Sequence, residues 1–271
     1  MDTYDRLYAG SVAVGTKAIF VPYEAEWGVG IFDVQKNSFQ TVSTDSSTSN
    51  WAGGSVVGTK VYFAPFNNAG VGVFDVATNQ FTTVVADNSY TNKRFDGATV
   101  GTKVIFAPYS GNDVGIFDAV TNSFSTSSFS TDQFRRRTTE RFTGAAAVGT
   151  TVYFSPHKSP CIGIYDVSTN TFSDMPLPFW GTQTSFSWSN YYYDGAIAAG
   201  TMVVFTPYAS DASYTNVGIL YTDTNIFKTF SISSTTASTN AFSGSAFFEQ
   251  LSAVTFAPSY SDKVSFFAIL P

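Results

Sequence analysis

One 24-residue stretch of the chain, GTKVYFAPFNNAGVGVFDVATNQF at residues 58–81, recurs in closely similar form as GTKVIFAPYSGNDVGIFDAVTNSF at residues 101–124. Further copies align on the proline of a Phe-x-Pro tripeptide. Six prolines mark the repeats: Pro22, Pro65, Pro108, Pro156, Pro207 and Pro258. The repeats are 43 to 51 residues apart, a period typical of β-propeller blades. No segment shows the sustained 3.6-residue apolar period of a helical solenoid.

Each repeat predicts four short strands. The first strand follows a glycine and leads into a Gly-Thr turn, the second ends at the proline, and an Asp-to-Asn turn separates the third from the fourth. The sequence therefore predicts an all-β fold, a six-bladed β-propeller with four antiparallel strands per blade. One domain is expected over residues 1–271, with blades at about 10–52, 53–95, 96–142, 143–193, 194–242 and 243–271 plus 2–8.

The sixth repeat is degenerate. Ala268 stands where the first four repeats have aspartate, and the sequence ends after the expected third strand. We expect residues 2–8 to supply the fourth strand, because closing the ring would remove two exposed sheet edges. The alternative is an open ring whose last blade has three strands.

Three recurring residue types have a structural interpretation. The aspartates open turns by accepting hydrogen bonds from backbone N–H groups, and the asparagines tolerate left-handed backbone geometry. The glycines of the third strand are expected to make room for an aromatic side chain of the next blade. These residues are Asp33, Asp75, Asp118 and Asp166; Asn37, Asn79, Asn122, Asn170 and Asn225; and Gly30, Gly72, Gly115, Gly163 and Gly218.

Composition narrows the classes of function. The chain is 17% aromatic but only 13% charged, its net charge is −6 and its pI is near 4.6. An acidic chain is unsuited to general nucleic-acid binding, which needs basic surface. Cys161 is the one cysteine, so no internal disulfide forms. We expect a soluble monomer without signal peptide, membrane insertion or cofactor, and the compartment stays open.

The unit KVYFAPFNNAGVGVFDVATNQFTTV resembles the YVTN-type β-propeller repeat and, more loosely, the kelch and gluconolactonase-like repeats. This resemblance covers nearly the whole chain and implies blade architecture. It does not imply one activity, since such propellers include surface proteins, scaffolds, carbohydrate binders, lyases and lactone hydrolases. The metal-ligand set of the gluconolactonases has no counterpart here, so the resemblance supplies no catalytic or metal-binding residue.

The two longest connections between repeats flank blade four. Loops of this length in a compact domain are usually functional or disordered. The first carries four arginines and the second is rich in aromatic residues, a combination that suits a sugar, an anionic ligand or a protein partner. The alternative is that the arginines pair with Asp132 and Glu140 and that the aromatics cover the blades. The main candidates are Arg135, Arg136, Arg137, Arg141, Trp180, Trp188 and Tyr192.

Blade four also breaks the repeat immediately after its proline. His157, the one histidine of the chain, stands where other blades have Tyr23, Phe66, Tyr109 and Tyr208. A histidine at a channel mouth can act as a general base, although a lone histidine is more often a loop residue. The other aromatics at this position are expected to pack between blades rather than to stack sugars.

Two aspartates extend the candidate site. Asp96 and Asp194 are expected to begin the first strands of blades three and five, with Thr143 at the matching position between them. If the chain is an enzyme, both carboxylates, His157 and an arginine should converge within about 8 Å.

Three functions follow from these patterns. The first is a non-catalytic propeller that recognises a carbohydrate or a protein through its top-face loops. The second is an enzyme, a lyase or hydrolase with a channel-mouth site near His157. The third is a purely structural surface protein.

Overall fold

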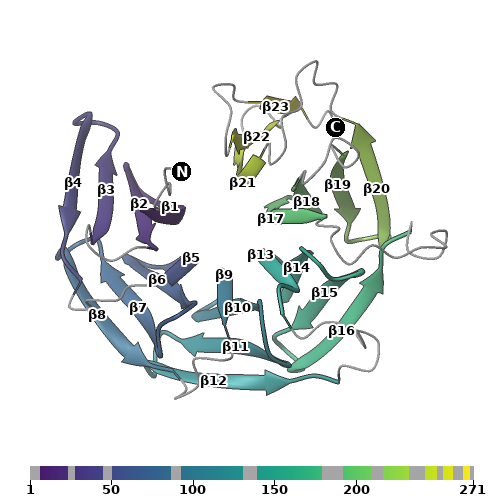
Figure 1. Cartoon of the computed structure of the whole chain (residues 1–271), viewed down its shortest axis with the longest axis horizontal. Coiled ribbons are helices and arrows are strands. Elements are labelled where there is room, and N and C mark those ends of the chain that lie inside the picture. Colours follow the sequence, from purple (N-terminus) through teal and green to yellow (C-terminus); the bar gives the residue numbers. More distant parts are fainter. Residues whose placement is uncertain are drawn as a thin grey trace, which may run out of the picture. The chain divides into compact units, whose positions relative to one another are not determined.

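The computed structural model describes residues 7–23, 28–44, 51–86, 93–130, 139–178, 192–208, 216–231, 242–248, 253–258 and 265–268. The chain divides into two compact units, Met1–Ser130 and Thr131–Pro271, and each is described by itself. Every described element is a β-strand or a turn (Figure 1). Within these ranges, no helix has the length and hydropathy that crossing a membrane requires.

The first unit holds three antiparallel sheets, each of four consecutive strands. The first strands of neighbouring sheets lie side by side, β1 against β5 and β5 against β9. The strands are β1 (Tyr8–Val14), β2 (Lys17–Pro22), β3 (Val29–Asp33) and β4 (Ser38–Val42); β5 (Trp51–Val57), β6 (Lys60–Pro65), β7 (Gly70–Asp75) and β8 (Gln80–Val85); and β9 (Arg94–Val100), β10 (Lys103–Pro108), β11 (Asp113–Asp118) and β12 (Ser123–Ser128).

The second unit holds two four-stranded sheets and one three-stranded sheet, again with β13 beside β17 and β17 beside β21. The strands are β13 (Phe142–Val148), β14 (Thr151–Pro156), β15 (Cys161–Asp166) and β16 (Thr171–Pro176); β17 (Tyr193–Ala199), β18 (Met202–Pro207), β19 (Asn216–Tyr221) and β20 (Ile226–Ser231); and β21 (Phe242–Phe248), β22 (Ala253–Pro258) and β23 (Ser265–Ala268).

The prediction of six four-stranded blades is wrong. The described residues form five such blades, and the sixth repeat forms only the sheet β21-β22-β23. Its last described strand ends at Ala268, which stands where the first four repeats have the aspartate that opens the turn to a fourth strand. Residues 2–6 lie outside the described ranges, but Tyr8 pairs with Pro22 in the first sheet and the Leu7 carbonyl accepts a hydrogen bond from the Tyr23 N–H. The described end of the segment 2–8 therefore belongs to blade one.

The recurring turns have the predicted chemistry. Asp75 Oδ1 accepts a hydrogen bond from the Ala77 N–H at 2.9 Å, and Asp33, Asp118 and Asp166 bond to turn N–H groups in the same way. The five recurring asparagines have φ values between 48° and 56°. This left-handed geometry suits asparagine better than most residues, and the structural interpretation of both positions is confirmed.

Each blade is organised around the first residue of its first strand, which we call the anchor. The anchors pair with the proline of the second strand, and a β-bulge follows each of them. A glycine in the third strand leaves room for the anchor: a Cβ on Gly72 would lie 3.1 Å from Trp51. The contact is with the anchor of the same blade, so the expectation of an aromatic from the next blade is wrong. The described anchors are Tyr8, Trp51, Arg94, Phe142 and Tyr193.

The core lies between adjacent sheets. In the first unit, Trp51, Phe63 and Phe81 of blade two pack against Ile19 and Ile31 of blade one. In the second unit, Tyr193 and Phe205 of blade five pack against Tyr153 and Ile162 of blade four. Burying a large apolar side chain contributes about 1.5–3 kcal/mol, so these interfaces between blades hold each unit together.

Blade three is the exception among the described anchors, because its anchor is an arginine. Arg94 is fully buried, its guanidinium forms an ion pair with Asp113, and Gly115 leaves space beside its Nε. In blade two the matching positions are Trp51 and Gly70, joined by a hydrogen bond from Trp51 Nε1 to the Gly70 carbonyl at 2.8 Å. An ion pair thus takes the place of an aromatic anchor.

We predict that Arg94→Ala lowers the free energy of unfolding by about 3–5 kcal/mol, because it leaves the Asp113 carboxylate mostly buried without the guanidinium. The double variant Arg94→Trp, Asp113→Gly copies blade two and should recover most of that loss. Chemical denaturation of both variants tests this prediction. It fails if the double variant is no more stable than Arg94→Ala.

Candidate functional site

The candidate site lies at one end of blade four, in the two residues that follow the proline of β14. His157 occupies the position where blade five has Tyr208, and the two rings meet edge-to-face with centroids 4.9 Å apart. In the first unit, the aromatic residues at the same position also pack against one another from blade to blade, Tyr23 against Phe66 and Phe66 against Tyr109. Packing between blades is therefore the common role of this position, and His157 keeps it while adding a titratable ring.

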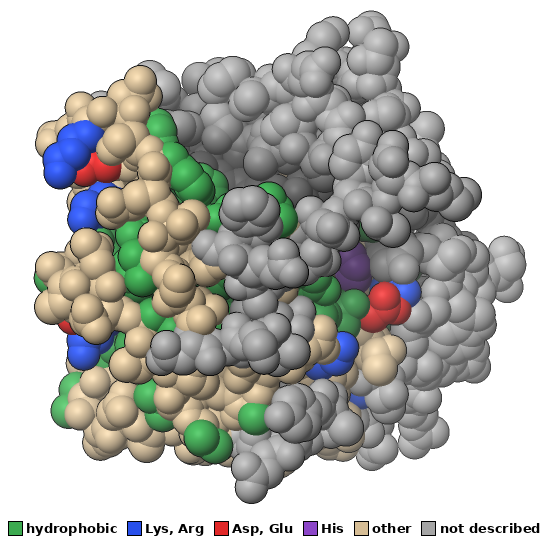
Figure 2. Space-filling model, turned by 60° about the vertical axis from the view of Figure 1, so that its left-hand side comes forward, with side chains coloured by type: hydrophobic (Ala, Val, Ile, Leu, Met, Phe, Trp, Pro, Cys, Tyr) green, Lys and Arg blue, Asp and Glu red, His purple; other side chains and the backbone are tan. Residues whose placement is uncertain are grey.

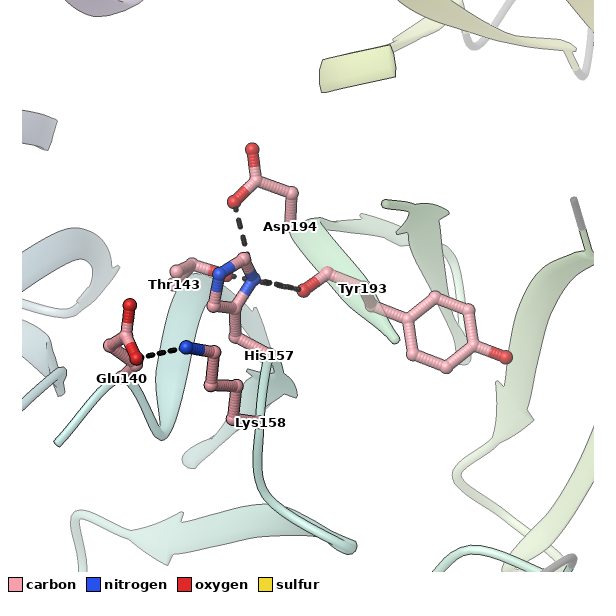
Figure 3. Close-up of polar contacts among 6 residues, drawn as sticks. All are labelled: Glu140, Thr143, His157, Lys158, Tyr193 and Asp194. Atoms are coloured by element: carbon pink, nitrogen blue, oxygen red, sulfur yellow. Dashed lines mark hydrogen bonds and ion pairs between the residues drawn. The ribbon is translucent and has the colours of Figure 1, made fainter. Parts of the chain in front are cut away.

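The imidazole is held by the beginning of β17 (Figure 3). His157 Nδ1 lies 3.1 Å from the Tyr193 carbonyl oxygen and 3.6 Å from Asp194 Oδ1. Thr143 of β13 donates its hydroxyl hydrogen to the same carbonyl at 3.3 Å. Because a carbonyl oxygen only accepts, Nδ1 carries the hydrogen in this bond. In the neutral ring the lone pair is then on Nε2.

A β-bulge explains why Asp194 is next to the histidine. Tyr193 pairs with Pro207 and Gly195 pairs with Thr206, so Asp194 is the extra residue of β17 at this point. A bulge bends its strand and re-aims the side chain at that position. The Tyr193 carbonyl and the Asp194 carboxylate therefore both face the end of blade four.

Burial controls the charge of His157. Only 6% of the residue is exposed, although part of the side chain is visible at the molecular surface (Figure 2). Burial lowers the pKa of His157, and the nearby Lys158 ammonium lowers it further. Asp194, the bond to the Tyr193 carbonyl and Glu140 act in the opposite direction, but the pKa stays below its usual range. The imidazole is therefore neutral at pH 7.

An ion pair lies beside the histidine. Lys158 Nζ contacts Glu140 Oε2, and the Lys158 N–H donates to the Glu140 carbonyl at 3.0 Å. Sequence reasoning missed this pair, having considered Glu140 only as a partner of loop arginines. The two residues are 18 positions apart, but the blade brings together the segment after its proline and the segment before its anchor. Blade three shows the same arrangement, because the Tyr109 and Ser110 N–H groups donate to the Lys93 carbonyl.

The arginine and aromatic candidates are only partly described. Arg135, Arg136, Arg137, Trp180 and Trp188 lie outside the described residues. Arg141 and Tyr192 are described, and both are buried. Burial lowers the pKa of Arg141, and its carbonyl accepts a hydrogen bond from the His157 N–H at 2.8 Å. The hypothesis of ligand binding by the long loops stays a prediction.

Asp96 has a different position from the one expected. It is two residues after the anchor Arg94, where the other described blades have glycine, whereas Asp194 directly follows the anchor Tyr193. Asp96 Oδ1 accepts hydrogen bonds from the Gly54 N–H at 3.1 Å and the Gly97 N–H at 2.8 Å. It joins blades two and three within the first unit, while Asp194 faces His157 in the second. Among the predicted candidates, the structure thus brings the side chains of His157 and Asp194 together, and Arg141 and Tyr192 bond to His157 through their backbones.

Neither a reactive thiol nor a metal site accompanies His157 among the described residues. Burial and the neighbouring Asp174 raise the pKa of the Cys161 thiol to about 12, so the thiol is protonated at neutral pH and is a poor nucleophile. Among the residues that the structure describes, no three His, Cys, Asp or Glu side chains are grouped so as to hold a metal ion.

Comparison with known proteins supports the fold. No protein-family model matches the chain, and no curated protein matches it by sequence. A streptogramin B lyase structure superposes with a TM-score of 0.70 at 15% identity, covering 92% of this chain and 75% of the lyase. Virginiamycin B lyase from Staphylococcus aureus gives a TM-score of 0.72 at 14% identity, covering 95% of this chain and 79% of the lyase. At this identity the likeness shows the β-propeller fold and leaves the activity open.

We predict that His157 makes stability depend on pH. Its pKa is lower in the folded chain than the ordinary value of 6.5, so the unfolded chain binds more protons as the pH falls below about 6.5. The contribution of neutral His157 to stability is complete above that pH and is lost as the pH falls through the folded-state pKa. His157→Phe should lack this part of the pH dependence, and thermal melts of both proteins between about pH 8 and pH 5 measure the difference. Parallel curves would contradict the assignment.

Proposed function

We propose that the chain is an enzyme of the lyase or hydrolase class in which His157 is the general base. The observation that carries this proposal is the neutral imidazole whose Nδ1–H bonds to the Tyr193 carbonyl and faces Asp194. A base held in one tautomer by its other nitrogen is the arrangement that proton abstraction requires. The same carbonyl and carboxylate stabilise the imidazolium that forms when Nε2 takes a proton.

The two reaction types differ in the source of that proton. In a lyase, Nε2 removes a proton from a carbon atom, the C–H electron pair forms a new double bond, and the leaving group departs with its own bonding pair. In a hydrolase, Nε2 removes a proton from water, and the water oxygen forms a bond to an electrophilic atom of the substrate. The bond to the leaving group then breaks, and the leaving group keeps that electron pair and takes the proton from the imidazolium. The fold likeness to two lyases favours the first type, and we therefore place elimination ahead of hydrolysis for this chain.

The test uses virginiamycin B as the first probe, followed by a panel of esters and lactones. We expect the wild-type chain to convert a member of the panel, and His157→Phe to lower kcat by about 10²–10⁴-fold, the usual contribution of a general base. Asp194→Asn should lower kcat less, because the Tyr193 carbonyl still orients the ring. Mass spectrometry separates the mechanisms, since elimination conserves the mass of the substrate and hydrolysis adds one water molecule.

The repeat itself indicates that the His157→Phe variant should fold. Phenylalanine is the residue at this position in blade two, where Phe66 packs against Tyr109, so His157→Phe should fold and keep the contact with Tyr208. Full activity in a folded His157→Phe variant would exclude His157 as the base.

A further inference from the structure

The ion pair between Lys158 and Glu140 is partly buried beside His157, and desolvation of the two charges costs free energy. The side chain of Lys158 is 9% exposed and that of Glu140 is 30% exposed, so both charges lose much of their hydration. Desolvation offsets much of the attraction in such a pair, and a buried pair is therefore weak evidence for stability. A role in controlling the surrounding structure is a better explanation of its presence.

The backbone at Glu140 supports that explanation. Glu140 has a φ of 58°, and it is the only described residue with a positive φ that is neither a glycine nor one of the recurring turn asparagines. The left-handed conformation costs a residue with a side chain roughly 1–2 kcal/mol. Lys158 contacts Glu140 twice, through the carboxylate and through the carbonyl. Strain of this kind persists where surrounding contacts enforce it, and it is frequent at functional sites.

The same contacts fix the segment that carries the imidazole. The N–H groups of His157 and Lys158 donate to the carbonyls of Arg141 and Glu140, and the His157 carbonyl accepts from the Tyr192 N–H at 2.8 Å. The segment is therefore bonded to the residues before β13 on one side and to those before β17 on the other. Displacing Glu140 would move one of these two supports.

The pair also places two opposite charges close to the ring. Glu140 favours the protonated imidazole and Lys158 favours the neutral one. The other titratable groups around the ring are Asp194 at the beginning of β17, Tyr208 after β18, and Arg141 and Tyr192 on the two supporting segments.

We propose that Glu140 and Lys158 act as one positioning unit for His157, fixing its segment and balancing two charges beside the ring. This proposal rests on the proposed role of His157 as the base. Removing one member leaves the other charge uncompensated, so the two single variants should act on His157 in opposite directions, and the double variant should return toward the wild type. A merely structural pair would destabilise the fold without this opposition.

The test follows the imidazole directly. His157 is the one histidine of the chain, so its ring C–H signals in NMR give an unambiguous titration without reference to any substrate. We expect the titration midpoint to fall in Glu140→Gln, to rise in Lys158→Met, and to return toward the wild-type value in the double variant. The acidic limb of the kcat/KM profile should shift in the same directions.

Two controls keep the outcomes distinct. Glu140→Gly removes the charge but accepts a φ of 58° without strain, so it should fold and show the same downward shift as Glu140→Gln. Lys228→Met removes an exposed lysine of β20 and should leave the midpoint unmoved. Unchanged midpoints in both pair variants would overturn the proposal. Opposite shifts in a protein without detectable activity would support the positioning unit and count against His157 as a catalytic base.

Discussion

The fold depends on one repeated contact: the anchor at the beginning of each first strand lies over the glycine of the third strand and beside the proline that ends the second. This contact fixes the register of three strands at once, because Trp51 pairs with Pro65 while a Cβ on Gly72 would crowd its ring at 3.1 Å. The rings of Phe63 and Phe81 complete the same cluster. Since that cluster packs against the neighbouring blade, the geometry within one blade determines how the next blade is stacked.

The recurring anchor geometry also explains how one end of a blade can vary. The bulge after the anchor leaves one residue outside the regular pairing, and its identity differs from blade to blade. In blade five it is Asp194, which faces His157. In blade three the corresponding stretch contains Asp96, which bonds to the Gly54 N–H of blade two. The same local irregularity therefore serves a structural bond in one unit and the candidate site in the other.

The sequence predicted the regular parts of each blade but not the contacts between segments that form the candidate site. Proline spacing and turn chemistry predicted every four-stranded sheet, because glycine, asparagine and aspartate act locally at turns. They did not decide between a sixth blade of four strands and the alternative of three strands, which is the number that the described residues of the sixth repeat form. A local pattern does not reveal whether another segment is present to complete the sheet. His157 was found as a break in the repeat, and Asp194 as a neighbouring carboxylate. Asp96 and Asp194 were wrongly treated as equivalent because both precede a glycine. Asp96 is two residues after its anchor, whereas Asp194 is one residue after its anchor. The Glu140–Lys158 pair was missed because it depends on which segments the blade brings together.

The position of His157 shows why such a site can arise in a regular scaffold without disturbing it. The ring still packs edge-to-face against Tyr208, as Phe66 packs against Tyr109 in the first unit, so the contact between blades is preserved. Compared with a phenyl ring, imidazole adds two ring nitrogens, which need polar partners when they are buried. The Tyr193 carbonyl and Asp194 face Nδ1, and the charged pair of Glu140 and Lys158 acts on the ring through its charges. A backbone carbonyl and one carboxylate at the beginning of β17 are thus what a histidine uses at a position that otherwise only packs rings between blades.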